Sequence, residues 1–393
     1  MSGTHLTGTL LEMPERGDLL GRARALIPSL QERAERTEEL RLIPPETIRD
    51  LAELGLLRVA NPKRYGGYGF DVDLFYEVVT ELARGCGSTA WCYSVWLAHN
   101  WMVGHWPERL QEEYFAGGPD TLSSSGFAPS GKLEPQEDGF KLSGRWDFSS
   151  GCDAATWALL GANSPTGPAY VMVPREDYRV IDTWFAAGLK GTGSKDIQVS
   201  NAFVPKHRMI TFRDLAIPPA PDLLAPRTPA WELHGLPSYR LPMMNVVSFA
   251  ISCPVVGMAQ GALDCFEESL RGKSGPGRTA DSVSIQMRFA EASAETEAAR
   301  VTTFYNLKEL LERSARGESM SVREFTGYQR NRIFAARLAV QAITRLFEVG
   351  GAHSVYASQA LQRYFRDAVI ASHHTSLNWD NILEQYGSVA LRG

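Results

Sequence analysis

Hydrophobic residues recur at helical spacing in the first part of the chain, residues 18–115. A second helix is predicted to begin at Pro44-Pro45-Glu46 and to end at Gly55. A third is predicted from Asp71 to about Arg84, after a Gly- and Pro-rich loop at residues 61–69. The apolar face of the first helix consists of Leu19, Ala23, Leu26, Ile27 and Leu30.

A fourth segment, from Ser88 to Trp106, is apolar on all sides and is therefore predicted to be a buried helix. His99 interrupts its apolar sequence, and an imidazole is costly to bury without a hydrogen-bond partner. Its aromatic residues are Trp91, Tyr93, Trp96, Trp101 and Trp106.

From Asp120 to about Arg208 the pattern changes to short alternating or β-branched runs, which are typical of strands. Turn signals such as Asp138-Gly139 and Gly191-Thr192-Gly193-Ser194 separate these runs. This spacing predicts a small β-barrel or sandwich with strands at 140–148, 155–162, 169–173, 179–184 and 196–204.

From Met243 onward the helical period returns, and it predicts four or five long helices packed as a bundle. The period is clearest at Ile285, Phe289, Ala292, Thr296, Ala299, Phe304, Leu307 and Leu311. The predicted protein is mainly α with a central β domain. Its parts are a helical domain, a β-barrel, an irregular Pro-rich connection and a helical bundle, at 1–119, 120–215, 216–242 and 243–393.

Composition restricts the partners. The chain has 393 residues, 44% of them hydrophobic, and a net charge of −5, so no overall field attracts nucleic acid or an anionic membrane. Five scattered cysteines without a CxxC pair indicate reduced thiols and predict neither disulfides nor a metal site. The N-terminus lacks a signal-peptide pattern, and the apolar stretch at 90–103 is too short to span a bilayer. We expect a soluble cytoplasmic protein that binds a small molecule.

The common nucleotide motifs are incomplete. The glycines of residues 188–193 are in the wrong order for a dinucleotide fingerprint, and Glu267 stands where a phosphate loop needs its first glycine. HExxH and GxSxG are absent. The chain is therefore not predicted to carry a nicotinamide- or ATP-binding domain of its own.

Three local sequences, in this order, resemble the acyl-CoA dehydrogenase fold: GRWDFSSG at 144–151, GLKGTGSKD at 188–196 followed by FVP at 203–205, and GG at 350–351 followed by RYFRD at 363–367. Over roughly residues 15–393 the chain is most similar to the monooxygenase branch of that family. This branch holds the two-component aromatic hydroxylases that use reduced flavin, such as the p-hydroxyphenylacetate and phenol-type hydroxylases. The resemblance implies a helical domain, a β-barrel and a C-terminal four-helix bundle that assembles a homotetramer.

The resemblance also implies the chemistry. Reduced FMN (FMNH2, with FADH2 possible) from a separate NAD(P)H:flavin reductase reacts with O2 to give C4a-hydroperoxyflavin. This hydroxylates or epoxidises an aromatic or heteroaromatic small molecule. The sequence leaves open the substrate, the reductase, FMN against FAD, and C- against N- or S-oxygenation. Two alternatives are an acyl-CoA dehydrogenase-type FAD oxidoreductase and a non-enzymatic helical scaffold.

The segment after Arg366-Asp367 separates these alternatives. Typical acyl-CoA dehydrogenases carry a catalytic glutamate here, but His374 or Thr375 stands in its place, with no carboxylate between Asp367 and Asp380. A histidine can donate a hydrogen bond or move a proton near neutral pH. In the hydroxylase branch one histidine of this segment is a site residue; His374 is the first candidate and His373 the second.

The resemblance assigns the flavin ring to Ser149 and Ser150, with Ser150 also catalytic, although a serine-rich β-turn would look the same. Trp146 is either a ring neighbour or a packing residue. Thr192 and Ser194 match a loop that hydrogen-bonds the flavin or its ribityl chain, and a plain hairpin turn is the alternative.

The cofactor tail is assigned to a second group of residues. Arg271 matches an arginine that family members send to the flavin phosphate of a neighbouring subunit, since a guanidinium suits phosphate, but it also fits a solvated arginine. Gly350, Gly351 and Ser354 match a loop that closes on the tail, although glycines commonly end helices.

The substrate is assigned to His99, Ser125 and Trp96, and His99 is also a catalytic candidate. His99 and Ser125 match residues that touch a phenolic oxygen; Ser123 and Ser124 are register alternatives for the serine. A satisfied core histidine is the alternative for His99. Trp96 and its neighbouring tryptophans are expected to keep the pocket dry, which limits loss of the peroxide.

Overall fold

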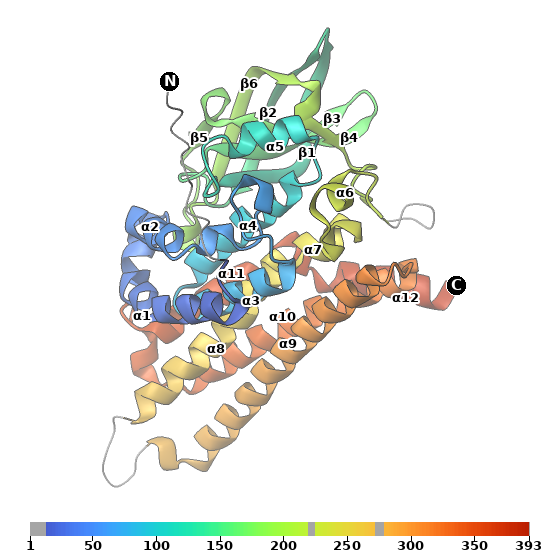
Figure 1. Cartoon of the computed structure of the whole chain (residues 1–393). Coiled ribbons are helices and arrows are strands. Elements are labelled where there is room, and N and C mark those ends of the chain that lie inside the picture. Colours follow the sequence, from blue (N-terminus) through green and yellow to red (C-terminus); the bar gives the residue numbers. More distant parts are fainter. Residues whose placement is uncertain (1–12, 219–224, 272–278, 393) are drawn as a thin grey trace, which may run out of the picture.

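The computed structural model describes residues 13–218, 225–271 and 279–392. The β domain lies on one side of the N-terminal helices, and the long C-terminal helices cross the opposite side (Figure 1). The N-terminal helices are α1 (Arg16–Leu40), α2 (Pro45–Glu53), α3 (Val72–Ala83), α4 (Gly87–Val103) and α5 (Glu108–Phe115).

The N-terminal helices follow the apolar pattern of the sequence. In α1, four of the five predicted face residues are buried, Leu19, Ala23, Leu26 and Leu30. Helix α2 ends at Glu53, and Gly55 follows with φ of 70°, a left-handed conformation that glycine adopts without strain. Every residue of α4 is buried, as its lack of a polar stripe predicts. Helix α4 packs against α3, against the β domain and against the C-terminal helices, so it lies where the three parts of the molecule meet.

The β domain is one mixed sheet with the strand order β5-β6-β2-β1-β3-β4-β7. Only β1 and β3 pair in parallel; the other neighbours are antiparallel. In the sheet, Leu160 and Val171 pack in the interior of the β domain, while Leu159 and Tyr170 belong to the core shared with the helices. The strands are β1 (Ser123–Gln136), β2 (Gly139–Ser149), β3 (Trp157–Ser164), β4 (Gly167–Pro174), β5 (Arg179–Ile181), β6 (Lys195–Pro205) and β7 (Met209–Thr211).

Strand β1 was not expected from the sequence. Its serines, glycines and prolines have low strand propensity, but its position between β2 and β3 supplies hydrogen bonds on both edges. The register shifts between Gly126 and Gly131, and a Cβ at either position would lie 2.4 Å from the Trp146 side chain. The glycines therefore make room for a tryptophan that fills the sheet interior.

The C-terminal part contains α6 (Ala230–His234), α7 (Met243–Val247), α8 (Phe249–Arg271), α9 (Val283–Ala315), α10 (Val322–Val349), α11 (Ala360–Ser372) and α12 (Trp379–Arg392). Five of these, α8 to α12, account for the four or five long helices that we expected. The described part of the Pro-rich connection contains a short helix, α6, which the sequence did not predict. Ser321 and Glu324 form a capping box at the start of α10.

Helix α8 packs against α3, α4 and α10, so it joins the N-terminal helices to the bundle. Among the described residues one stretch, Met243–Arg271, is apolar and long enough to cross a membrane, but 94% of its apolar window is buried inside the protein. That burial is typical of a core helix.

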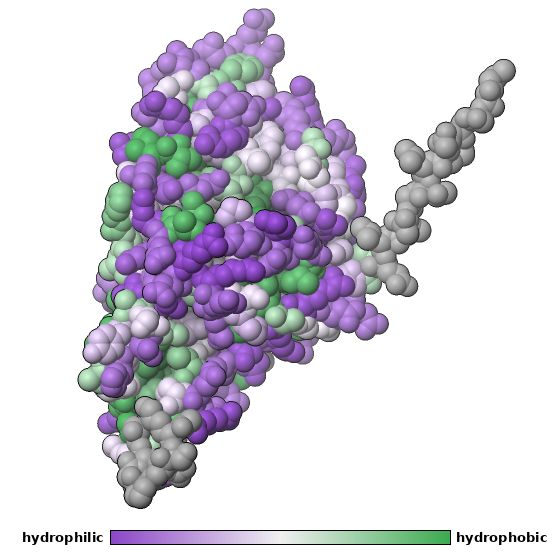
Figure 2. Space-filling view, turned by 90° about the vertical axis from the view of Figure 1, so that its left-hand side faces the viewer, coloured by the Kyte–Doolittle hydropathy of each residue, from purple (hydrophilic) through white to green (hydrophobic). Residues whose placement is uncertain are grey.

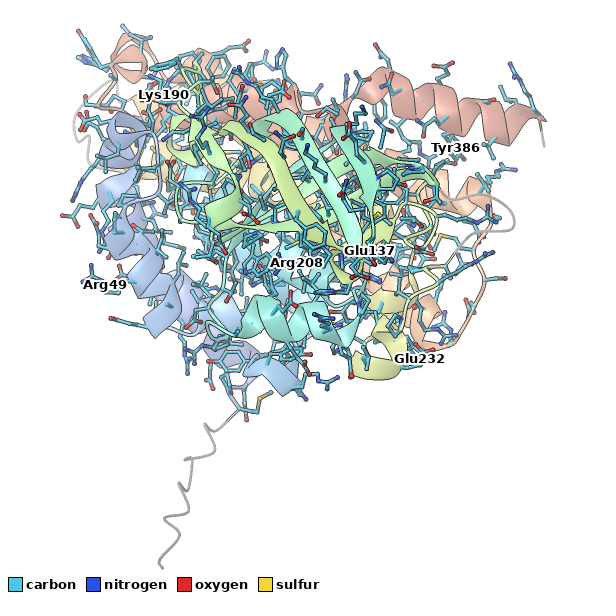
Figure 3. All side chains as sticks on the ribbon, turned by 90° about the horizontal axis from the view of Figure 1, so that it is seen from above. Arg49, Glu137, Lys190, Arg208, Glu232 and Tyr386 are labelled. Carbon is cyan, nitrogen blue, oxygen red and sulfur yellow. The ribbon has the colours of Figure 1, made fainter. Side chains whose placement is uncertain are left out.

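One face of the molecule is largely hydrophilic (Figure 2). On the face that lies at the left of Figure 1, hydrophilic residues predominate and hydrophobic ones gather in separate patches (Figure 2). Seen from above, the sheet lies over the helical core, with Arg208 and Glu137 near its strands, while α12, which carries Tyr386, extends to one side (Figure 3). The sheet thus covers the helices around α4.

Candidate active site

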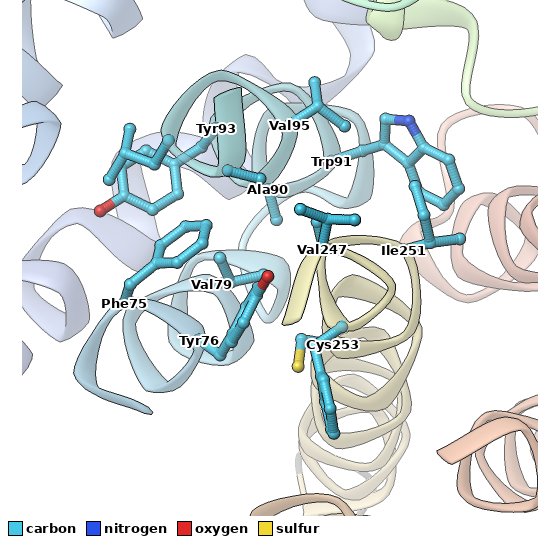
Figure 4. Close-up of a cluster of buried hydrophobic side chains, with 14 of the residues drawn as sticks. Phe75, Tyr76, Val79, Ala90, Trp91, Tyr93, Val95, Val247, Ile251 and Cys253 are labelled. Carbon is cyan, nitrogen blue, oxygen red and sulfur yellow. The ribbon is translucent and has the colours of Figure 1, made fainter. Parts of the chain in front are cut away.

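A cavity of about 630 Å³ lies between α4, the β domain and the C-terminal helices. Its volume is within the usual range for small-molecule and cofactor sites. Figure 4 shows part of its apolar wall, where Trp91 and Val95 of α4 lie near Val247 and Ile251 at the junction of α7 and α8. The polar side chains that line it are Ser125, Asp147, Ser150, Ser194, Ser248, Thr375 and Ser376, together with His99, His373, His374 and Tyr170.

His99 presents a hydrogen-bond acceptor to the cavity. Its Nδ1 lies 2.7 Å from the Ser123 carbonyl oxygen, which can only accept, so Nδ1 carries the proton and Nε2 keeps its lone pair. The residue is 1% exposed. Burial lowers the pKa of His99 to about 4, so the ring is neutral near pH 7.

His374 presents the opposite tautomer. Its Nδ1 accepts a hydrogen bond from the Ser376 N–H at 3.1 Å, so the proton lies on Nε2, which is a donor. Burial, with a smaller contribution from the positive charge of Arg332, lowers the pKa of His374 to about 4. Its ring meets Trp91 edge-on, with 5.8 Å between centroids. His373 also lines the cavity but is exposed, and its Nδ1 donates to the Val369 carbonyl.

Two hydrogen bonds join the three predicted hydroxyl groups of the β domain into a chain, and two more hold its ends. Thr192 Oγ1 donates to the Leu189 carbonyl at 2.8 Å, so it accepts from Ser194 at 2.6 Å, and Ser194 in turn accepts from Ser150 at 2.8 Å. Trp91 Nε1 donates to Ser150 Oγ at 3.1 Å. Because the Ser150 proton is used within this chain, Ser150 offers the cavity a lone pair.

The Arg366-Asp367 pair of the sequence holds the loop that carries these hydroxyls. Asp367 Oδ1 accepts the Leu189 N–H at 2.6 Å, and Arg366 donates to the Ala187 carbonyl and to Glu38 of α1. Leu189 has φ of 48°, just before the short 3₁₀ helix η4 (Lys190–Thr192). Burial raises the pKa of Asp367 to about 7. Arg366 and Asp367 therefore affect the site by holding the loop at residues 187–189 in place.

Six predicted residues therefore line one cavity: His99, Ser125, Ser150, Ser194, His373 and His374. Thr192 joins them through Ser194. The register alternatives for the serine point elsewhere: Ser123 Oγ accepts from Tyr114, and Ser124 is buried without a partner among the described residues. Among these three serines only Ser125 lines the cavity.

Three predicted residues of this region are buried beside the cavity and do not line it. Trp146 packs in the sheet interior and donates to the Gly161 carbonyl at 2.7 Å, which fits the packing alternative. Trp96 is fully buried and donates to the Gly151 carbonyl. Ser149 is fully buried, and its Oγ has no partner among the described residues.

Arg271, Gly350, Gly351 and Ser354 do not line the cavity of this single chain. Arg271 ends α8, is exposed and pairs with Glu267 at 2.5 Å. Ser354 donates to the Gly351 carbonyl just after α10. Their contacts with a cofactor tail, with Arg271 reaching the flavin of a neighbouring subunit, stay predictions.

The sequence did not single out several lining residues. Phe127, Phe148, Tyr170 and Trp184 add aromatic surface, and periodicity cannot separate such residues from ordinary core. Phe148 is 68% exposed and has φ of 60°, a conformation that is rare for bulky side chains and that occurs at functional sites. The sequence feature that could have identified Phe148 as a site residue is its position in the GRWDFSSG motif.

Comparisons with known proteins agree with this architecture. Residues 22–115 match the acyl-CoA dehydrogenase N-terminal domain, and residues 249–379 match the acyl-CoA dehydrogenase C-terminal domain. The flavin-dependent monooxygenase oxygenase subunit HsaA of Rhodococcus jostii is 34% identical over 93% of this chain and 96% of its own length. The FADH2-dependent resorcinol hydroxylase oxygenase component of a Rhizobium species is 30% identical over 95% of this chain and 94% of its own length.

The solved structures agree as well. The 3-HSA hydroxylase of Rhodococcus sp. RHA1 superposes with a TM-score of 0.89 at 34% identity, covering 95% of this chain and 97% of that one. The chain therefore belongs to the acyl-CoA dehydrogenase-fold family. Within that family it is a member of the flavin-dependent monooxygenase oxygenase components.

Proposed function

We propose that this protein is the oxygenase component of a two-component monooxygenase, which uses FMNH2 or FADH2 and O2 to hydroxylate or epoxidise an aromatic or heteroaromatic small molecule. The observation that carries this proposal is a largely apolar cavity that holds an acceptor at His99, a donor at His374 and an acceptor at Ser150. The relatives named above include a hydroxylase of resorcinol, a phenol.

The cavity residues fit a reduced flavin. Ser150 offers a lone pair, which suits the N–H that a reduced flavin carries at N5, while Trp91 and Trp184 provide flat apolar surface. When bound, reduced flavin supplies the two electrons with which one atom of O2 becomes transferable. The site has no carboxylate in the His374 segment for abstraction of a proton from an acyl thioester, which disfavours the dehydrogenase alternative.

His374 acts at the oxygen side of the reaction. Its Nε2–H donates a hydrogen bond to the reacting oxygen, and the Ser376 N–H prevents the ring from exchanging tautomers. Because the ring is neutral and only partly exposed, it holds its proton firmly until a strongly basic oxygen forms. The apolar walls exclude water, which reduces the release of hydrogen peroxide.

His99 acts at the substrate side. Its Nε2 accepts the proton of a substrate hydroxyl in a hydrogen bond, which increases the electron density of a phenolic ring and prepares it for attack by oxygen. Ser125 lies in the same wall, and the rings of His99, Phe127 and Tyr170 follow one another at 5.8 and 5.3 Å. These residues would hold a planar ring.

We further propose a homotetramer in the cytoplasm, served by a separate NAD(P)H:flavin reductase. Helix α9 exposes Val283, Met287, Val301 and Tyr305, which supports packing against other copies through the bundle. Such packing would bring Arg271 and the loop at Gly350, Gly351 and Ser354 to the cofactor tail of a neighbour. All five cysteines are free, as in reduced cytoplasmic proteins.

Rapid mixing tests the proposed function. The protein, loaded anaerobically with FMNH2, is mixed with oxygenated buffer and followed by flavin absorbance. We expect reoxidation to be slower than that of free FMNH2 and to pass through a separate absorbance transient. Reoxidation at the rate of the free flavin would contradict the proposal. Reduction of ferrocenium with butyryl-CoA would instead support the dehydrogenase alternative.

A further inference from the structure

Arg332 of α10 is a buried arginine whose hydrogen bonds all go to neutral acceptors. It is 1% exposed. It donates to the Ser248 carbonyl at 3.0 Å, to the Ser376 carbonyl at 2.8 Å and twice to Gln329 Oε1. No carboxylate of the described residues contacts it. By contrast, Arg58 and Arg366 each pair with an acidic side chain.

The titratable neighbours of Arg332 do not supply the missing charge. These are Tyr76 of α3, Cys253 of α8 and His374. Burial raises the pKa of Tyr76 and of Cys253, so both are neutral near pH 7, and His374 is neutral as well. A buried charge without a counter-charge is strongly unfavourable, so its presence calls for an explanation.

The position of Arg332 connects it to the cavity. Ser248 and Ser376, whose carbonyls it holds, are both lining residues. The N–H of Ser376 also fixes the tautomer of His374. The guanidinium therefore lies directly behind the wall that carries the proposed donor, where a low dielectric lets its charge act across the wall.

We propose that Arg332 is the counter-charge of the cavity, and that it makes the cavity select an anionic aromatic ring over the neutral form of the same ring. This inference rests on the proposed function, because the reduced isoalloxazine readily loses its N1 proton and becomes such an anion. An anionic aromatic substrate has the same chemistry. Arg332 does not itself line the cavity, so it would be a positioning residue that acts through its electric field and through Ser376.

Two variants with a matched control test this inference. Arg332→Gln removes the charge and Arg332→Lys retains it, while Arg330→Gln removes a charge from the same helix, where Arg330 contacts Asn331 and Tyr386. Dissociation constants for FMN and FMNH2 are measured anaerobically by tryptophan fluorescence. The phosphate is common to both forms and cancels in their ratio.

We expect the unaltered protein to bind FMNH2 more tightly than FMN. Arg332→Gln should reduce this preference at least tenfold, while Arg332→Lys and Arg330→Gln retain it within about threefold. A merely structural role would weaken both forms equally and leave the ratio unchanged, which would overturn the inference for the flavin.

A second pair of probes, benzoate and benzamide, distinguishes the source of the anion. A loss of preference in Arg332→Gln for benzoate alone would assign the charge to an anionic substrate. If the unaltered protein prefers the anion in neither pair, the inference is wrong whether or not Arg332→Gln folds. If the unaltered protein binds neither FMN nor FMNH2, the proposed function itself fails.

Discussion

At the scale of single residues, two neutral histidines with opposite tautomers define the site. The Ser123 carbonyl accepts a hydrogen bond from Nδ1–H of His99, while the Ser376 N–H donates one to Nδ1 of His374. His99 therefore offers the cavity an acceptor at Nε2, and His374 offers the same cavity a donor at Nε2. Backbone groups impose both states, so they do not depend on a titration near pH 7.

The donor role of His374 can be tested without removing its structural role. His374 caps the short 3₁₀ helix η9 (Thr375–Leu377) through Nδ1, and asparagine is also a good cap. His374→Asn should therefore keep stability within about 1 kcal/mol while it removes the Nε2 donor.

We expect His374→Asn to lower the fraction of FMNH2 oxidation that yields oxygenated product about tenfold or more, with a matching rise in hydrogen peroxide. Product and peroxide are quantified in the same reaction, and thermal unfolding serves as the control. Unchanged coupling in a stable variant would exclude His374 as the donor.

At the scale of elements, α11 and the loop before η4 hold the hydroxyl chain through one buried carboxylate. Asp367 of α11 accepts the Leu189 N–H, and Leu189 in turn accepts from Thr192 and from Trp184. The folded-state pKa of Asp367 is raised to about 7, mainly because the group is buried. Its contribution to stability is therefore present at low pH and lost as the pH rises through about 7.

Asp367→Asn should remove this pH-dependent loss while the amide oxygen still accepts the Leu189 N–H. The difference in melting temperature between the variant and the unaltered protein should become more favourable to the variant from pH 5 to pH 8. Thermal unfolding across this range measures it. A difference that does not change with pH would show that Asp367 is ionised in the same way in both states.

The lowered pKa values of the histidines have the opposite effect on stability, and this effect operates at lower pH. Burial lowers the pKa of His105 to about 3 and that of His234 to about 4, as it does for the two site histidines. The unfolded chain binds more protons at these positions, so their contribution to stability is lost as the pH falls below about 6.5. The Asp367→Asn variant and the unaltered protein share these histidines, so their contribution cancels when the two proteins are compared.

At the scale of the whole molecule, the single chain provides a cavity but leaves part of the predicted cofactor site elsewhere. Arg271 and the loop at Gly350 and Gly351 do not line it. The exposed apolar residues of α9, including Val301 at 53% and Tyr305 at 64%, mark a surface that a tetramer would cover.

A double substitution, Val301→Glu with Tyr305→Glu, should dissociate the proposed tetramer, because it would place two charges in the proposed apolar contact. Sedimentation or light scattering measures the mass. Phe203→Glu is the control, since Phe203 is similarly exposed but belongs to β6. If dissociation leaves FMNH2 affinity unchanged, a neighbouring subunit does not hold the cofactor tail; an unchanged mass would instead exclude α9 as the contact.

The sequence by itself determined the order of helical and β segments, since periods of 3.6 and 2 are local properties. It also determined the family, through motifs at 144–151, 188–196 and 363–367, and the absence of a carboxylate beside His374. Strand β1 escaped prediction because its partners on both sides, and not its own residues, stabilise it.

Only the tertiary structure decided which motif residues share a cavity. Trp146 and Ser150 belong to one motif, but they have different environments. Trp146 lies within β2 beside Gly126 and Gly131 and fills the sheet interior, whereas Ser150 follows the strand after a register shift and lines the cavity. The tautomer of His99 is set by the Ser123 carbonyl, which is 24 residues away in the sequence. The tautomer of His374 is set by the Ser376 N–H, whose orientation the sequence does not predict. In the sequence, Arg332 cannot be distinguished from other polar helix residues. The structure shows that it is buried without a counter-charge among the described residues, because burial and charge pairing depend on how the core is assembled.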